Sequence, residues 1–258
     1  MSRVYPPVGQ DTKDKYVGKV FKSNNYGDFI VLEFNAVEDV KIKFLNTGFI
    51  DTVFIHQVRT GRVRDYMQYL ILSKGIIGAK LTSDERKHKA YKNWYRILSR
   101  CYDEKLRDKH PTYLGCTMSE YFLTYTNFKE WYVSQPYWDA DGYVLDKDLL
   151  VKGNKVYSPE TCCFIPTAIN SLLTTTGKNR GKLPIGVRLA KGGVRYQSDI
   201  GKNGKNYYLG TYDTINEAFN SYKEAREGYY KEKAEEWRCA LSKDAYIALR
   251  DRVVEITD

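Results

Sequence analysis

The stretch VLDKDLLVKGNKVYSPETCCFIPTAIN, residues Val144–Asn170, carries the strongest structural signal in this chain. It starts with a short apolar segment followed by two acids, Asp146 and Asp148, and continues into a basic loop with Lys152 and Lys155. A Ser-Pro-Glu turn, a second short apolar segment and a helix-like segment follow. The pattern therefore predicts two short strands and a helix, with two carboxylates at the end of the first strand.

Composition points to a polyanionic partner. The chain has 258 residues, with 41 Lys and Arg against 32 Asp and Glu, and a net charge of +9. Such a surplus favours nucleic acid as the partner. No apolar run approaches the roughly 20 residues of a membrane span, so we expect no membrane partner. The five cysteines include no C-x-x-C pair, which favours a reducing, intracellular compartment, and we expect no structural zinc.

The organisation of the chain predicts an α+β protein of several domains. Its N-terminal part contains the short strand-like runs KVF, DFIVLEF, VKIKF and DTVFIHQV, which favour a small β-barrel or curled sheet. We expect a loose N-terminus, this β-rich domain, a linker, a helical plus ββα domain, a basic linker, and a C-terminal domain of three strands and helices. Their respective bounds are 1–15, 16–66, 67–82, 83–173, 174–183 and 184–258.

A central segment predicts an amphipathic helix. Its apolar residues recur at helical spacing, and Ser83 precedes them as a candidate N-cap. The apolar stripe consists of Ala90, Trp94, Ile97, Leu98 and Cys101. The polar face carries six basic residues: Arg86, Lys87, Lys89, Lys92, Arg96 and Arg100. Such a face is usually only solvated, and contact with DNA is the alternative. A second helical segment near Thr126–Ser134 adds Phe128 and Trp131 to the same core.

The C-terminal region predicts a basic three-stranded sheet. The runs IGVRLA, VRYQSDI and KNYYLGTY lie between Pro184 and Tyr212, separated by glycine turns. Thr214 or Asn216 is expected to cap a helix covering one face of the sheet, and a last helix is expected from Ser242 to about Glu255. The other face can enter the major groove, where Arg contacts guanine and Asn or Gln contacts adenine. The candidate DNA-binding residues are Arg188, Arg195, Gln197, Asp199, Lys202, Lys205, Asn206 and Tyr208.

This region resembles the plant ethylene-response-factor (Apetala-type) DNA-binding domain. The matching residues are GVR at Gly186–Arg188, YLGTY at Tyr208–Tyr212 and the Glu217-Ala218 pair in the following helix. The resemblance implies that Arg188, Arg195, Asp199 and Tyr208 face DNA. Gly201 stands where that family often has a further arginine, so the base preference does not carry over. The alternative is a basic sheet that packs on some other surface.

The segment Leu145–Asn170 is similar to the finger of phage-type HNH homing endonucleases. The resemblance implies a Mg²⁺ ion bound by Asp146 and Asn170, an origin in a bacteriophage or mobile element, and a location in the bacterial host cytoplasm. Lys147 stands where that family has its base histidine, and Thr161 where it has a middle asparagine. Asp148 can serve as base or second ligand, so we take Asp146, Lys147 and Asp148 as catalytic candidates.

Three functions remain open, of which the third is a structural or RNA-binding protein; the β-rich N-terminus and the many tyrosines fit it, but the C-terminal sheet favours duplex DNA. The first is a site-specific double-stranded DNA-binding protein of HNH homing-endonuclease type that nicks or cuts DNA with Mg²⁺. The second is a catalytically inactive derivative that acts as a DNA-binding transcriptional repressor. In the first two, the basic loop with Lys152 and Lys155 is expected to contact phosphates without sequence preference. The oligomeric state stays open, with a dimer as one option.

Overall fold

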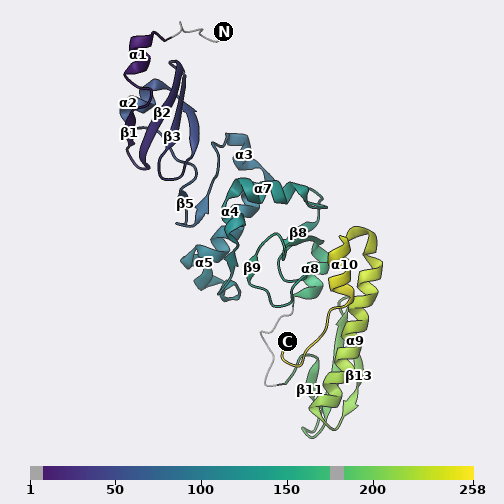
Figure 1. Cartoon of the computed structure of the whole chain (residues 1–258). Coiled ribbons are helices and arrows are strands. Elements are labelled where there is room, and N and C mark those ends of the chain that lie inside the picture. The colour runs from purple at the N-terminus through teal and green to yellow at the C-terminus, as the bar shows by residue number, and fades with distance from the viewer. Residues whose placement is uncertain (1–7, 175–182) are drawn as a thin grey trace. The chain divides into compact units, whose positions relative to one another are not determined.

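The computed structural model describes residues 8–174 and 183–258, and Figure 1 shows its elements. The predicted mixture of helices and strands is confirmed, with several separate sheets. The chain forms two compact units. Unit 1 is Met1–Leu114 with Met118–Glu130, and unit 2 is Gly115–Thr117 with Trp131–Asp258. Within the described ranges, no helix has the length and apolar character needed to cross a membrane.

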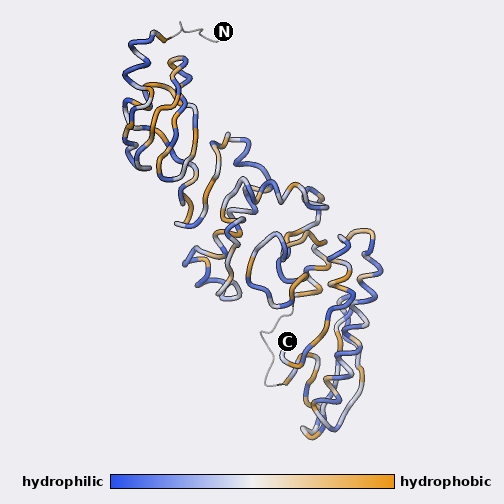
Figure 2. The backbone as a smooth tube through the Cα atoms, viewed as in Figure 1, coloured by the Kyte–Doolittle hydropathy of each residue, from blue (hydrophilic) through white to orange (hydrophobic). Residues whose placement is uncertain are grey.

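Unit 1 begins with the short helix α1 (Gln10–Asp14) and a four-stranded antiparallel sheet. Its strands are β1 (Val20–Ser23), β2 (Gly27–Ala36), β3 (Asp39–Phe44) and β4 (Ile50–Val53), in that order. Alternate residues of β2 and β3 are fully buried, among them Phe29, Val31, Val40, Ile42 and Phe44. Hydrophobic and hydrophilic colours are interspersed in this part of the chain in Figure 2. Period-2 alternation therefore forms this core, as expected for a sheet buried on one face.

Of the two predicted forms, a small β-barrel or a curled sheet, the barrel is wrong, because this sheet stays open. β1 pairs only with β2 and β4 only with β3, so the described residues contain no closed barrel. Closure would require pairing of the two edge strands, β1 and β4, which have only four residues each. The predicted strand DTVFIHQV also ends early. Helix α2 (Ile55–Thr60) takes over its second half, ending at Gly61 with φ 65°. The left-handed conformation at Gly61 is a common helix stop.

The segment expected as a linker, 67–82, contains the hairpin β5 (Tyr69–Ile71) and β6 (Gly75–Ile76). Gly75 fits closely against the following helical block. A Cβ atom on this residue would lie 2.6 Å from Leu98 Cδ2 and 3.1 Å from the Trp94 ring. The hairpin therefore packs on the helices of unit 1.

The helical block contains α3 (Ser83–Lys87), α4 (Lys89–Tyr102), α5 (Glu104–Lys109), the 3₁₀ turn η1 (Pro111–Tyr113), α6 (Glu120–Leu123) and α7 (Tyr125–Ser134). All five residues of the predicted apolar stripe on α4 are buried, which confirms that prediction. The predicted N-cap Ser83 is wrong by one residue: the Thr82 hydroxyl accepts the Glu85 amide. His88 caps α4 by accepting the Ala90 amide.

Unit 2 contains the predicted strand-strand-helix finger. Its elements are β8 (Tyr143–Asp146), β9 (Val156–Tyr157), β10 (Cys163–Pro166) and α8 (Thr167–Leu173). β8 and β10 are antiparallel, with Asp146 opposite Cys163. The Ser-Pro-Glu turn closes where the Cys162 amide donates to the Ser158 carbonyl. The ββα layout predicted from the sequence is therefore present.

The C-terminal part of unit 2 has the predicted three strands and helices. β11 (Val187–Leu189), β12 (Tyr196–Lys202) and β13 (Lys205–Tyr212) pair in that order. They precede α9 (Ile215–Glu236), the 3₁₀ turn η2 (Arg238–Ala240) and α10 (Lys243–Arg250). Thr214 caps α9 in a capping box with Glu217. The last helix ends at Arg250, five residues before the predicted end, and Val253 is consequently exposed.

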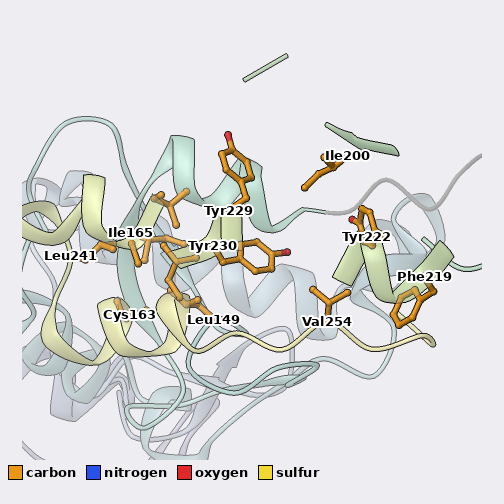
Figure 3. Close-up of a cluster of buried hydrophobic side chains, with 14 of the residues drawn as sticks. Leu149, Cys163, Ile165, Ile200, Phe219, Tyr222, Tyr229, Tyr230, Leu241 and Val254 are labelled. Carbon is orange, nitrogen blue, oxygen red and sulfur yellow. The ribbon is translucent and has the colours of Figure 1, made fainter. Parts of the chain in front are cut away.

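One hydrophobic core joins the finger to this C-terminal part. Leu149 and Ile165 of the finger belong to the same buried cluster as Tyr230, Leu241 and Val254, as Figure 3 shows. Of the expected linker 174–183, residues 175–182 lie outside the described residues. The shared core means that the finger is supported from the C-terminal side by α9, α10 and the chain end.

Candidate nucleic-acid interface and finger

The C-terminal sheet has one covered face and one open face. Side chains alternate along a strand, and Val187, Ser198 and Ile200 on the covered side are buried. Val187 and Ile200 pack in one cluster with Ala218 and Tyr222 of α9. Among the described residues of this unit, no helix lies against the opposite face in Figure 1. The sheet therefore offers a polar surface on a rigid support.

Strand register brings most of the predicted DNA-binding residues onto this open face. Arg188 of β11 lies opposite Gln197 of β12, and Asp199 lies opposite Tyr208 of β13. Asn206 lies opposite Gly201, two residues beyond Asp199 on the same face. A bulge between Ser198 and Asp199 shifts the register, so that Tyr208 joins this face. We refer to Arg188, Arg195, Gln197, Asp199, Asn206 and Tyr208 as the outer face.

Arg188 is held in a two-point ion pair. Its Nε lies 2.5 Å from Asp199 Oδ2 and its Nη2 lies 3.3 Å from Asp199 Oδ1. The Arg188 side chain is 63% exposed. Hydrogen bonding to the Asp199 carboxylate raises the pKa of Arg188 further above its ordinary value. This geometry orients the guanidinium and leaves its Nη1 donors free of protein partners among the described residues.

Arg195 is held at the end of the sheet. Its Nε donates to Asp213 Oδ1 at 2.7 Å and its Nη2 to the Thr211 carbonyl at 3.2 Å. The Tyr208 hydroxyl lies 2.7 Å from Thr211 Oγ1, and the Tyr208 residue is 61% exposed. Sequence reasoning missed Asp213 and Thr211 as supporting residues. The only sequence feature that could have indicated this support is the position of Asp213, an acid directly after the third strand.

Lys202 and Lys205 do not belong to the outer face. Lys202 lies two residues after Ile200 on β12 and therefore on the same, covered face of the sheet. Its Nζ lies 5.2 Å from the ring centroid of Tyr229 on α9. Lys205 pairs with Lys202 across the hairpin and is exposed. These two lysines therefore lie at the tip and helix side of the sheet, because alternation along a strand places them away from Arg188.

In the finger, Asp146 acts as a turn residue. Its Oδ1 accepts the amides of Asp148 at 3.0 Å and Leu149 at 2.7 Å, which closes the end of β8. Burial and, secondly, the Asp148 charge raise the pKa of Asp146 to about 6. The carboxylate is thus partly withdrawn from solvent, and one of its oxygens is committed to the backbone.

Lys147 and Asp148 contact each other. Lys147 Nζ lies 3.0 Å from Asp148 Oδ2 and donates to the Asn154 carbonyl at 2.9 Å. The Lys147 side chain is only 12% exposed, and its Nζ lies 5.8 Å from the Tyr157 ring centroid. Both contacts engage Lys147 Nζ with groups of the loop itself. The arrangement gives Lys147 a structural role in the loop.

Asn154 fastens the finger loop. Its amide nitrogen donates to the carbonyls of Lys147 at 2.7 Å and Val156 at 2.6 Å, and its Oδ1 accepts the Val156 amide at 3.0 Å. Thr161 holds the following turn by donating to the Val156 carbonyl at 2.7 Å. Sequence reasoning placed Asn154 only in a loop, and its Asn-x-Val spacing carried no clear signal of these three bonds.

In this arrangement the acids of the finger are engaged by neighbouring protein groups. The described residues contain no group of three or more His, Cys, Asp or Glu side chains placed to hold an ion. Asp146 uses one oxygen in its turn, and Asp148 is paired with Lys147. The predicted ligand Asn170 lies on α8, where its carbonyl accepts the Thr174 hydroxyl, and none of its described contacts is to Asp146. Magnesium usually takes only one or two protein carboxylates and completes its octahedron with waters and substrate phosphates, so the Mg²⁺ site at Asp146 and Asn170 stays a prediction.

The two loop lysines differ in their surroundings. Lys152 Nζ lies 2.7 Å from Asp258 Oδ1 and 3.6 Å from Glu255 Oε2, and donates to the Val253 carbonyl at 3.1 Å. This lysine therefore holds the C-terminal segment of the chain. Lys155 is exposed, and its carbonyl accepts the Thr117 amide. The sequence could not show the acids near Lys152, because they lie about a hundred residues later.

Comparison with protein-family models, with curated proteins and with solved structures found no match to this chain.

Proposed function

We propose that this chain is a site-specific double-stranded DNA-binding protein whose outer face enters the major groove. The observation that carries the proposal is the open face of β11–β13, which presents Arg188, Gln197 and Asn206 while α9 covers the opposite side. The major groove admits a sheet of two or three strands. Arginine donors suit guanine, and the amides of Gln197 and Asn206 suit adenine.

Pre-orientation supports specificity at this face. The Asp199 carboxylate fixes the direction of the Arg188 guanidinium, so less side-chain freedom is lost when a base is bound. Asp199 also opposes close approach of a phosphate next to it, because two negative charges would meet. The pair therefore favours contact with a base edge over contact with the DNA backbone.

The HNH-like finger supports a binding role ahead of a cleaving one. Asp146 caps a turn, Lys147 is tied to Asp148 and Asn154, and the described residues contain no group of three His, Cys, Asp or Glu side chains placed to hold an ion. We therefore place the chain as a DNA-binding derivative of the HNH homing-endonuclease type, with transcriptional repression as the biological role. Metal-dependent nicking is the second candidate, favoured by the ββα layout with adjacent acids at its first strand.

To test the binding proposal, the full chain is used to select its preferred duplex from a random DNA pool. The affinities of the wild-type chain and its variants for that duplex are then measured. Arg188→Ala and Gln197→Ala should each weaken binding by about 5- to 150-fold, the range for loss of one good base contact. Arg188→Lys should also weaken it, because a lysine lacks the two-point geometry. Lys231→Ala, which removes an exposed charge from α9, is the matched control. Equal affinities for all four variants would refute the proposal.

The cleavage candidate is tested separately with the selected duplex in Mg²⁺ or Mn²⁺. We expect binding without strand scission in either metal. Scission by the wild-type chain that disappears in Asp146→Asn would instead establish the nuclease. The asparagine retains the oxygen that accepts the two turn amides, so loss of scission would not follow from a broken turn.

A further inference from the structure

The exposed side of α4 forms one wall of a cavity of about 620 Å³ within unit 1. Lys92, Arg96 and Arg100 lie on this wall at helical spacing, on the side opposite the buried Trp94 and Leu98. The helix α5 and the turn η1 fold back and supply Leu106, His110 and Tyr113 as the other wall. A cavity of this size suits a small organic ligand.

The charge of this cavity is one-sided. Four of its lining residues are Lys or Arg, and none is Asp or Glu. Lys92, Arg96 and Arg100 form no ion pair with any carboxylate in the part of the chain that the structure describes. Three cations that face the same cavity repel one another, which favours an anion between them. The lining of this cavity therefore favours a ligand with at least one negative charge.

Aromatic rings lie between these cations. Tyr91 and Tyr95 are spaced by one helical turn on α4, and Tyr113 faces them from η1. Arg100 lies 5.0 Å from the Tyr113 ring centroid, and Arg86 lies 5.9 Å from the Tyr91 ring centroid. Tyr95 is 47% exposed and makes no ring contact with another described residue. Its open ring face is available for a planar ligand group.

We propose that this cavity binds a nucleotide, with the phosphate between Lys92, Arg96 and Arg100 and the base stacked on Tyr95. Alternation of cations with exposed aromatic rings is the arrangement that binds unpaired nucleotides, because every base has a π-face and every phosphate a charge. A sulfate or simple phosphate would use only the cations, and an apolar ligand only the rings. The site belongs to unit 1 and is independent of the outer face of the C-terminal sheet.

The test is calorimetric titration of the full chain with deoxyadenosine 5′-monophosphate, deoxyadenosine and inorganic phosphate. The nucleotide should bind more tightly than the nucleoside or the phosphate alone. Tyr95→Ala should weaken nucleotide binding by about 5- to 150-fold, the range for one base-aromatic stack, and Tyr95→Phe should retain it. Arg96→Ala should weaken it too, whereas Lys105→Ala, an exposed charge outside the cavity, should not.

Two further measurements complete the test. One distinguishes a single strand from a free nucleotide as the ligand, and the other distinguishes this cavity from the outer face of the sheet. A ten-residue single strand of deoxyadenosine that binds more tightly than the mononucleotide identifies a strand as the source, and equal affinity identifies a free nucleotide; both support the site. Arg188→Ala should leave mononucleotide binding unchanged, which keeps this result distinct from duplex binding by the sheet. Mononucleotide binding that is absent, or is equal in Tyr95→Ala and Tyr95→Phe, overturns the proposal.

Discussion

Asp146 is a carboxyl group that the folded chain stabilises in its neutral form. Burial and the nearby Asp148 raise its pKa from 3.8 to about 6. Its Oδ1 accepts the amides of Asp148 and Leu149. Asparagine at this position retains an oxygen acceptor for both amides and removes the charge. We therefore expect Asp146→Asn to be more stable than the wild-type chain at pH 7.5.

The size of this gain follows from the pKa of Asp146. Between pH 3.8 and about 6, the folded state keeps a proton that the unfolded chain has released, so stability falls as the pH rises through this window. One pKa unit corresponds to about 1.4 kcal/mol, which gives a gain of up to about 3 kcal/mol for the variant above pH 6. Below pH 3.8 both states are protonated and the variant loses this advantage.

Urea denaturation followed by tryptophan fluorescence at pH 4, 5, 6, 7 and 8 measures this difference. The control is Glu232→Gln, an exposed acid on α9, which should change stability by less than about 0.5 kcal/mol at every pH. A variant that is less stable than wild type at pH 7.5 would refute the reasoning, because the charge would then be compensated in the fold. A Mg²⁺-dependent rise in wild-type stability that is absent in Asp146→Asn would show that the carboxylate binds metal.

The remaining predictions concern the support of the finger and sheet, each checked by the urea midpoint of the full chain. Gly186→Ala should cost at least about 2 kcal/mol, because Gly186 has φ +76° and a Cβ atom would lie 2.0 Å from the Tyr222 ring; an unchanged midpoint would contradict this packing. Thr214→Ala should cost about 1 kcal/mol through loss of the α9 cap, and Thr214→Ser should restore it. Asn154→Ala should cost about 2 kcal/mol through three lost backbone bonds, whereas a change within error would show that water replaces them.

Local pattern was sufficient to predict much of the fold. The spacing of Ala90, Trp94 and Leu98 predicted the buried side of α4, because a helix returns to the same face every three or four residues. The finger followed from two short apolar runs around a Ser-Pro-Glu turn. The three C-terminal strands followed from their glycine turns. In each case the signal and the structure lie within about thirty residues.

Contacts between distant residues could not be predicted in this way. The pairing of Arg188 with Asp199 depends on strand register, and so does the bulge that brings Tyr208 onto the outer face, where Leu209 of β13 falls outside the register with β12. The cavity beside α4 depends on how α5 and η1 fold back. The error at residues 16–66 arose because alternation predicts strands and a buried face but does not specify whether the two edges of a sheet meet.

The contact of Lys152 with the chain end also constrains the order of folding. Lys152 is separated by 101 residues from Val253 and by 106 from Asp258. Val254 is itself held by Lys223 and Glu227 of α9, so this segment is placed only once α9 has formed. Closure of so long a loop is entropically costly before other contacts exist. We therefore expect the finger loop to reach its final form late, and a chain cut before Val253 to lose the clamp on that loop.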